Sequence, residues 1–345
     1  MGFAEVLNSG ISALLEYLSA HVLTCLVPAF FIAGAIAVFV SQAAVMKYFG
    51  AKANKVLSYS VASVSGTILA VCSCTILPLF AGIHKRGAGL GPAIAFLYSG
   101  PAINVLAIVY TARLLGFDLG LARAIGAISF SIIIGLIMAF IWRKEELEKE
   151  KNASELILPE SEKPKHEGIT ILYFAVLVGI LLFGAAKKWL AFGILLVILL
   201  LILYRWFKKD ELKNWMYQTW DLGKKIFPIL LIGVFIAGMM KVLLPQTVVE
   251  HLVGGNGLRA NFIASIFGAF MYFSTLTEVP IIKALMDLGM GKGPALALLL
   301  AGPALSLPNM IVIAGIMGIK KTAVYVFLVV IMATMTGMFF GSLVF

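Results

Sequence analysis

Residues 87–104 read GAGLGPAIAFLYSGPAIN, and residues 289–306 read GMGKGPALALLLAGPALS. Ten of these eighteen positions are identical at a constant offset of 202 residues. A second motif, FIAG at 31–34, returns at 235–238 with an offset of 204. The pattern predicts a chain made of two related halves, because self-similarity at a fixed spacing is typical of an internally duplicated fold.

The composition indicates a membrane protein. Of the 345 residues, 61% are hydrophobic and 13% are charged, about half the charged fraction of an ordinary soluble domain. Apolar runs of about 20 residues can cross a bilayer as helices, and the period-two alternation of a membrane barrel is absent. We therefore expect an all-α polytopic protein with about ten transmembrane helices, at 20–41, 56–80, 91–112, 122–142, 169–185, 189–207, 225–244, 261–285, 294–317 and 322–344.

These runs group into two four-helix repeats that flank a two-helix insert. We expect a first repeat at 1–142, which opens with an amphipathic helix at the membrane interface, and a second repeat at 209–345. Between them lie a charged, solvated linker at 143–168 and a helical hairpin at 169–208. An even insert predicts parallel repeats related by an axis along the membrane normal, whereas one miscounted span would make them inverted.

Charge sets the orientation and excludes some functions. The net charge is +10, but the basic residues lie mainly between apolar runs, so nucleic acid is not an expected partner. The loops on the linker side hold 16 Lys and Arg against 11 elsewhere, which predicts cytoplasmic termini in the cell membrane. No Walker loop or HExxH motif is present, so we expect neither an enzyme nor a metal or other cofactor.

Each half carries a polar interruption just before a proline inside an apolar run. VCSCTILP at 71–78 aligns with FSTLTEVP at 273–280. Pro78 and Pro280 each remove one helical hydrogen bond, so a kinked helix with local Ser and Thr partners is the simple interpretation. The functional interpretation is a solute site between the halves. Helical spacing gathers its polar side chains on one face, namely Ser274, Thr277 and Glu278 in one half and Cys72 and Thr75 in the other.

Glu278 is the strongest single candidate. It lies deep in an apolar run, with no charged neighbour in the sequence. A carboxylate in a membrane is costly and marks a functional site by default. Burial favours its neutral form, so we expect Glu278 to carry a proton in a coupled transport cycle. The alternative is a structural, protonated Glu that bonds to a neighbouring helix.

A second constellation is the Gly-Pro pair within each repeated stretch. A Gly-Pro pair in mid-span breaks a helix and exposes a helix N-terminus, which binds anions and polar groups in transporters. Close helix packing through small residues is the structural alternative. With Pro78 and Pro280, the predicted helix-breaking residues are Gly100, Pro101, Gly302 and Pro303. The predicted polar ligands beside the Gly-Pro pairs are Asn104 and Asn309.

The CysSerCys motif ahead of Pro78, a basic glycine turn, and SGPAIN at 99–104 together resemble the predicted permease family that includes the organoarsenical efflux permeases. The resemblance extends to the second half and implies a multi-pass permease. For characterised relatives it implies export of trivalent organoarsenicals, with Cys72 and Cys74 as candidate ligands. Thiolate sulfur suits such a soft cargo better than carboxylate or imidazole.

The preferred hypothesis is a secondary transporter, coupled to protons through Glu278, that exports a soft metalloid or a small anionic solute. A membrane thiol–disulfide carrier using Cys72 and Cys74 is the alternative, although C-x-C is not the usual spacing of a redox pair. An assembly subunit without transport is a third reading, which the duplicated polar faces disfavour. The expected partners are lipid and a small solute, and the sequence leaves the oligomeric state open.

Overall fold

We describe the protein from a computed structural model, which covers residues 3–19, 22, 26–39, 53–69, 73–103, 105–148, 167–185, 188–243, 252–271 and 275–343. Across these ranges every named element is a helix, which confirms the all-helical class. The first part of the chain contains α1 (Phe3–Tyr17), α2 (Val27–Phe39), α4 (Lys55–Leu69), α5 (Ser73–Lys85), α6 (Leu90–Ala102), α7 (Val105–Leu114) and α8 (Phe117–Ile141).

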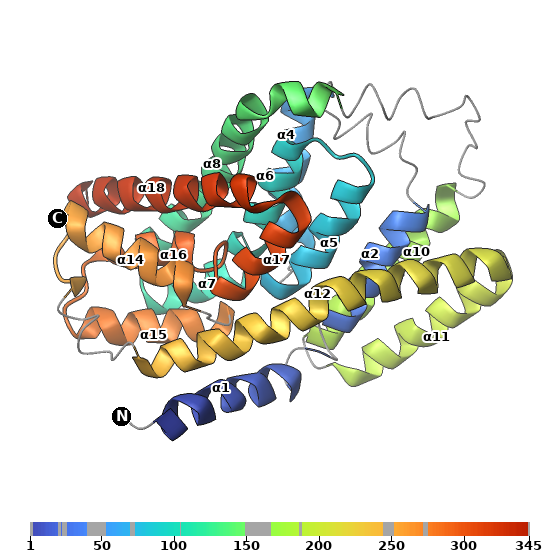
Figure 1. The fold of residues 1–345 in the computed structure, drawn as a ribbon, viewed down its shortest axis with the longest axis horizontal. Coiled ribbons are helices and arrows are strands. Elements are labelled where there is room, and N and C mark those ends of the chain that lie inside the picture. The colour runs from blue at the N-terminus through green and yellow to red at the C-terminus, as the bar shows by residue number, and fades with distance from the viewer. Residues whose placement is uncertain are drawn as a thin grey trace.

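The second part opens with a hairpin and one long helix, and five further helices follow. These elements are α10 (Glu167–Ala185), α11 (Trp189–Trp206), α12 (Lys209–Leu243), α14 (Leu258–Phe270), α15 (Thr275–Asp287), α16 (Lys292–Ala301), α17 (Leu307–Met317) and α18 (Ile319–Leu343). In Figure 1 the blue-to-green helices of the first half lie beside the orange and red helices of the second.

Three helices, α8, α11 and α18, are each long and apolar enough to cross a membrane. Helices α6 and α7 together pass the same test as a pair bent by 46°. The number ten remains a prediction, because four of the predicted runs each correspond to two shorter helices. Gly-Pro pairs accompany two of these divisions, at the ends of α6 and α16, whereas Pro78 and Pro280 lie inside α5 and α15 and do not end a helix.

Helix positions follow the spacing of the sequence repeat. Helices α5, α6, α7 and α8 begin at residues 73, 90, 105 and 117, and α15, α16, α17 and α18 begin at 275, 292, 307 and 319. Each pair of starts differs by 202 residues, the offset of the repeated stretch. The last pair also ends in register, at residues 141 and 343.

The same spacing recurs where helices approach most closely. A Cβ built on Gly135 of α8 would lie 2.6 Å from the carbonyl oxygen of Gly91 in α6. A Cβ on Gly337 of α18 would lie 2.7 Å from the carbonyl oxygen of Gly293 in α16. Small residues allow this backbone approach in membrane helices. Both contacts use positions that are 202 residues apart.

The two halves contact each other reciprocally. Helix α5 packs on α17, and α7 packs on α15. Because α15 corresponds to α5 and α17 corresponds to α7 at the 202-residue offset, the two contacts are equivalent to each other. Between the halves the Tyr98 hydroxyl donates a hydrogen bond of 3.0 Å to the Leu300 carbonyl oxygen. These two residues are themselves 202 positions apart. Contacts between equivalent positions occur near the axis of a two-fold arrangement.

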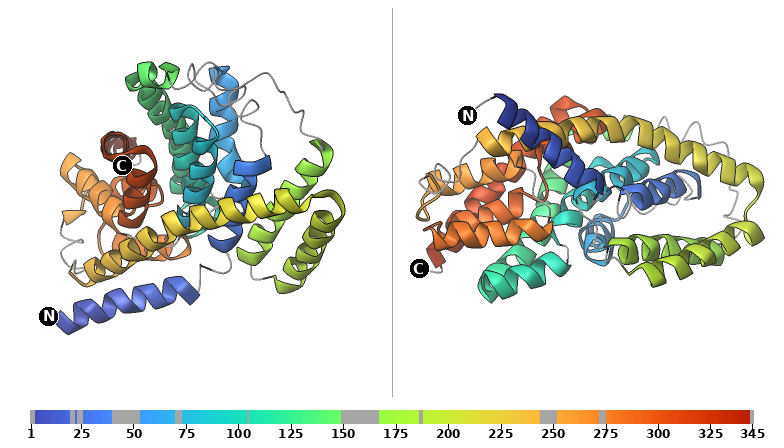
Figure 2. Two further views of the ribbon diagram at one scale, coloured as in Figure 1. Left: turned by 45° about the vertical axis from the view of Figure 1, so that its right-hand side comes forward. Right: turned by 90° about the horizontal axis from the view of Figure 1, so that it is seen from below.

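The remaining helices surround this centre. Helix α12 packs on α1, α2 and α17, and Trp215 of α12 donates a hydrogen bond of 2.9 Å to the Phe31 carbonyl oxygen of α2. The α10–α11 hairpin contacts α2 and projects to one end of the molecule, as both views in Figure 2 show. Most side chains of α11 are exposed although the helix is apolar, as expected for a helix that faces lipid.

The predicted linker begins inside the packed structure. Residues 143–148 are helical, and the Glu146 carboxylate accepts a hydrogen bond of 2.8 Å from the Leu90 backbone N–H at the start of α6. Glu145 forms an ion pair of 2.7 Å with Lys321 of α18. Of these residues only Glu146 is buried, whereas Arg143, Lys144, Glu145 and Glu148 are exposed, so the solvated linker remains a prediction. The stretch 149–166 lies outside the described residues.

Candidate polar site between the two halves

Glu278 lies in the first turn of α15 and is 1% exposed. Its helix starts at Thr275, just after the polar interruption of the sequence and five residues before Pro280. A carboxylate in the first turn interacts favourably with the unpaired backbone N–H groups and the positive end of the helix dipole. This position gives the buried acid some local support, but too little to compensate a full charge in an apolar interior.

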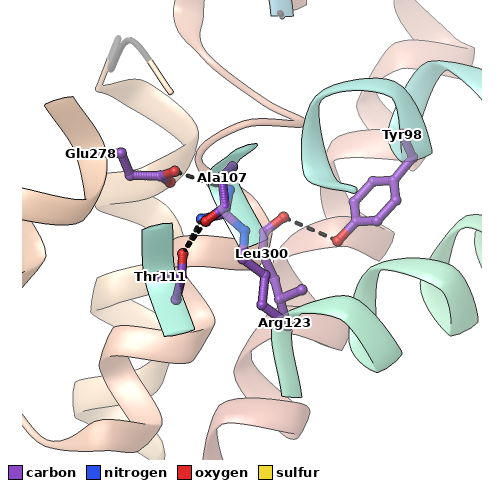
Figure 3. Close-up of polar contacts among 6 residues, drawn as sticks. All are labelled: Tyr98, Ala107, Thr111, Arg123, Glu278 and Leu300. Carbon is purple, nitrogen blue, oxygen red and sulfur yellow. Dashed lines mark hydrogen bonds and ion pairs between the residues drawn. The ribbon is translucent and has the colours of Figure 1, made fainter. Parts of the chain in front are cut away.

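The missing compensation comes from Arg123 on α8, whose side chain is fully buried. Its Nη2 donates to Glu278 Oε2 at 3.2 Å, and its Nη1 donates to Thr111 Oγ1 of α7 at 3.0 Å. The Thr111 hydroxyl in turn donates to the Ala107 carbonyl oxygen at 2.7 Å. Figure 3 shows these side chains converging from α7, α8 and α15. We call Thr111, Arg123 and Glu278 the charged cluster.

The charged cluster is incompletely satisfied. Arg123 Nε and Glu278 Oε1 are both buried without a hydrogen-bond partner in the structure. A buried ion pair repays its desolvation only when its remaining donors and acceptors are also bonded. The cluster therefore keeps one donor and one acceptor available to a further polar group.

The equivalent positions in the other half carry no such charges. The positions 202 residues away from Thr111, Arg123 and Glu278 hold Ile313, Tyr325 and Ile76. All three are buried, at 0%, 0% and 1% exposed. Uncharged side chains of α5, α17 and α18 thus occupy the positions that correspond to the cluster formed by α15, α7 and α8. Because well-packed apolar groups often stabilise as much as a buried ion pair, the charges point to a function other than stability.

The cluster lies close to the contact between the halves. Tyr98, whose hydroxyl bonds to Leu300 across that contact, lies near Arg123 (Figure 3). It interacts electrostatically with both Arg123 and Tyr325. The Tyr325 hydroxyl approaches the Ala304 carbonyl oxygen at 3.4 Å. Equivalent positions on α8 and α18 therefore flank the same tyrosine, and only one of them is charged.

A break in the second half connects the cluster to further polar atoms. Gly302 ends α16, and a Cβ built on it would lie 2.9 Å from Glu278 Oε1. Four residues further along, Ser306 precedes α17, at most about 14 Å of chain away. Ser306 Oγ and Asn309 Oδ1 are buried without hydrogen-bond partners. The segment between α16 and α17 thus has the Glu278 carboxylate beside its first residue and two buried, unsatisfied polar atoms at its far end.

The structure places the predicted site residues unevenly. Glu278 and Asn309 are buried on α15 and α17, and Thr75 is 1% exposed on α5. Gly100 and Pro101 lie in the last turn of α6, while Pro303 follows the end of α16, and Pro78 and Pro280 lie inside α5 and α15. The predicted residues that lie outside the described set are Cys72, Asn104 and Ser274, together with the side chains of Cys74 and Thr277.

Two members of the charged cluster, Arg123 and Thr111, are absent from the sequence-based prediction. Arg123 lies near the start of the predicted span 122–142, where a basic residue reads as an anchor of a helix end. The sequence does contain a signal for Arg123, because a buried arginine inside an apolar run needs an oppositely charged partner as much as a buried glutamate does. The two residues are 155 positions apart, so their pairing is not visible in the sequence.

Comparison with known proteins is consistent with this geometry. The family model described as predicted permease matches residues 8–342. The UPF0718 protein MJ0584 of Methanocaldococcus jannaschii is 48% identical, over 98% of this chain and 96% of its own length. The UPF0718 protein YraQ of Escherichia coli is 22% identical, over 70% of this chain and 56% of its own length. No solved structure matches the chain.

These matches confirm the resemblance that the repeated motifs indicated. The family match covers both halves together with the hairpin between them. With its long apolar helices and its permease-family match, the protein is a multi-pass membrane protein of a transporter-like class. The chain belongs to the predicted permease family.

Proposed function

We propose that the protein is a proton-coupled secondary transporter whose solute crosses between two structural repeats. The observation that carries this proposal is the buried, incompletely bonded Arg123–Glu278 pair where α7 and α8 of the first half meet α15 of the second. Sites of this kind, at the interface of repeats and beside broken helices, are characteristic of secondary transporters.

The repeat architecture is supported by the helix starts at a constant spacing of 202 residues and by the reciprocal α5–α17 and α7–α15 contacts. In the transport cycle the repeats rock against each other about the central helices. The broken segments α6–α7 and α16–α17 lie in both halves and give each repeat a polar helix end that faces the solute path.

Glu278 supplies the proton step. When it is ionised, the ion pair with Arg123 joins α8 to α15 across the halves. When it takes up a proton, the electrostatic attraction is lost and the two halves can separate. A group that switches an interface in this way couples the proton gradient to the conformational change.

For the cargo we retain a soft metalloid such as an organoarsenical, or a small anionic solute. The Cys72 and Cys74 thiols would bind the first, and the polar atoms of Ser306 and Asn309 suit the second. We propose export across the cytoplasmic membrane, with both termini in the cytoplasm.

The test is transport by the purified protein reconstituted into vesicles with an imposed pH gradient. Methylarsenite, arsenite and methylarsonate serve as cargo probes. We expect Glu278→Gln to remove the dependence of transport on the pH gradient, because the amide cannot exchange a proton. The matched control is Asp287→Asn on the same helix, which removes an exposed carboxylate that pairs with Lys283. Normal, gradient-driven transport by Glu278→Gln would contradict the proposal.

A further inference from the structure

We infer that the cargo carries an anionic group, which replaces the Glu278 carboxylate on Arg123 when Glu278 takes up a proton. This inference rests on the proposed function and deepens it, because it names the substrate class of the same site. It makes Arg123 a substrate-binding residue that exchanges one negative partner for another.

The geometry of the guanidinium supports the exchange. Nε and Nη2 lie on the same edge of an arginine side chain, and together they form the fork that binds a carboxylate, phosphate or arsonate through two parallel hydrogen bonds. Glu278 uses only Nη2 of that edge, at 3.2 Å, and leaves Nε without a partner. An oxyanion in the place of Glu278 would accept hydrogen bonds from both Nε and Nη2. Glu278 accepts from Nη2 alone, so one of the two parallel hydrogen bonds is unused.

Arg123 keeps its position when Glu278 leaves. The Nη1 group on the other side of the guanidinium donates to Thr111, and Thr111 is fixed by its own hydrogen bond to the Ala107 carbonyl oxygen. Both of these residues lie on α7, which neighbours α8 in the same half. The arginine is therefore oriented from within its own repeat, while its negative partner comes from the other.

Charge balance makes the two events depend on each other. A fully buried guanidinium cannot remain without a negative partner at acceptable free energy. Protonation of Glu278 without an anion would leave Arg123 unpaired, and an anion beside ionised Glu278 would place two negative charges on one cation. Only the exchange of both, one proton in and one anion in, keeps the site neutral.

No other acid in the described structure competes for this role. On the helices that pack against α15, the remaining charged or titratable groups are Tyr110, Arg113, Asp118 and Lys292, with Tyr98 on α6 beside Arg123. Asp118 and Lys292 form their own ion pair at 2.8 Å, and Lys283 and Asp287 of α15 do the same at 2.6 Å.

The duplicated positions set the stoichiometry. In the other half the equivalents of Arg123 and Glu278 are Tyr325 and Ile76, which supply neither a guanidinium fork nor a carboxylate. We therefore expect one anion and one proton per chain, although the fold contains two related interfaces.

The experiment is calorimetric titration of the purified full-length protein in lipid nanodiscs with methylarsonate, inorganic phosphate and acetate. Titration in buffers of different ionisation enthalpy also counts protons. We expect the wild type to take up about one proton per bound anion and to gain about tenfold in affinity per pH unit lowered, as linkage requires above the titration of Glu278. Acetate stays ionised near neutral pH, so Glu278→Gln should bind it with an affinity that does not change with pH and without proton uptake. Phosphate and methylarsonate exchange protons of their own in this range, so the proton count is taken from acetate.

Arg123→Gln should lose anion binding, and Arg123→Lys should weaken it, because a lysine lacks the fork. Arg113→Gln, which removes an exposed arginine from α7, is the matched control and should bind as the wild type does. If Arg123→Gln does not fold, the proton uptake and the pH dependence of binding in Glu278→Gln still test the inference.

Three outcomes would overturn the inference: no binding of any of the three anions to either wild type or Glu278→Gln, equal binding by Arg123→Gln, or proton uptake that persists in Glu278→Gln. Each of these can occur while vesicle transport still depends on Glu278, so this inference can fail without the proposed function. Conversely, gradient-driven transport by Glu278→Gln would reject the proposed function even if Arg123 binds anions.

Discussion

At the scale of single residues, the most informative feature is the buried ion pair between Arg123 and Glu278, whose hydrogen bonds are incomplete. Arg123 and Glu278 are buried to the same degree, and each retains an unsatisfied atom. A purely structural pair would be expected to complete its hydrogen bonds, because each unsatisfied buried group costs about 1–3 kcal/mol. The pair is therefore suited to a change of partner.

A mutational cycle tests whether the charges serve the fold. We expect Glu278→Ile to lower the free energy of unfolding in detergent by about 3–5 kcal/mol, because Arg123 is left as an uncompensated buried charge. Adding Arg123→Tyr and Thr111→Ile, which copies the residues of the other half, should recover most of that loss. Vesicle transport should stay absent in the triple variant. A triple variant less stable than Glu278→Ile would show that the charged cluster is needed for packing.

Gly302 provides a second test at this scale. Its backbone angles are helical, at φ −57° and ψ −54°, so alanine is allowed there. The added Cβ would lie 2.9 Å from Glu278 Oε1 and 3.1 Å from the Leu298 carbonyl oxygen. We expect Gly302→Ala to lower the free energy of unfolding by about 1–3 kcal/mol and to slow transport.

The control for that substitution is Gly193→Ala in α11. Nothing lies within 4 Å of a Cβ at this position. Helix propensity alone should then raise the free energy of unfolding by up to about 1 kcal/mol, without an effect on transport. Equal effects at the two positions would mean that the carboxylate does not occupy the space beside Gly302.

At the scale of elements, the same packing device occurs in each half. Helices α6 and α8 meet at Gly91 and Gly135, and α16 and α18 meet at Gly293 and Gly337. The broken pairs α6–α7 and α16–α17 then follow the glycine contacts at equal spacing. Close backbone contact makes each of these helix pairs a rigid unit, so that motion is expected at the breaks and at the contact between halves.

Equivalence of the two glycine contacts is testable. We expect Gly135→Val and Gly337→Val to reduce the yield of folded protein and its thermal stability to a similar extent, because each forces two helices apart. Gly193→Val, at an uncrowded helix position, should have a much smaller effect. A large effect at only one of the two contacts would argue against equivalent roles.

At the scale of the whole molecule, the open question is how the proposed repeats are related to the membrane. The reciprocal contacts between halves fit a two-fold relation, and such an axis can run along the membrane normal or lie in its plane. The two cases differ in the location of equivalent loops. The turn at Gly87 and the turn at Gly289 lie on one side of the membrane in parallel repeats and on opposite sides in inverted ones.

Cysteine labelling distinguishes the two. Lys85 and Asp287 are equivalent positions two residues before these turns, and both are exposed. Single cysteines can replace them in a variant in which Cys25, Cys72 and Cys74 are serine, which avoids the positive φ of Gly87 and Gly289. We expect an impermeant maleimide to label both positions from the same side, the cytoplasmic one, in oriented vesicles or intact cells. Labelling from opposite sides would show that the repeats are inverted.

The sequence by itself determined the membrane class, revealed the repeated motifs and singled out one candidate residue, Glu278. An apolar excess leaves the chain no soluble alternative, a repeated motif at one offset marks two halves, and a lone acid in an apolar run stands out because burial of a charge is costly. The Gly-Pro pairs also marked the ends of α6 and α16, since the backbone effects of glycine and proline are local.

Only the tertiary structure decided which helices are in contact and which basic residue forms the ion pair with Glu278. Helical periodicity describes each segment alone and is silent about partners in distant segments. In the sequence, Arg123 has the position of an ordinary anchor at a helix end. In the folded protein, its Nη2 lies 3.2 Å from the carboxylate of Glu278, which is 155 residues away in the chain. The difference between the halves, charged on one side and apolar on the other, likewise becomes meaningful only when equivalent positions are seen in equivalent contacts.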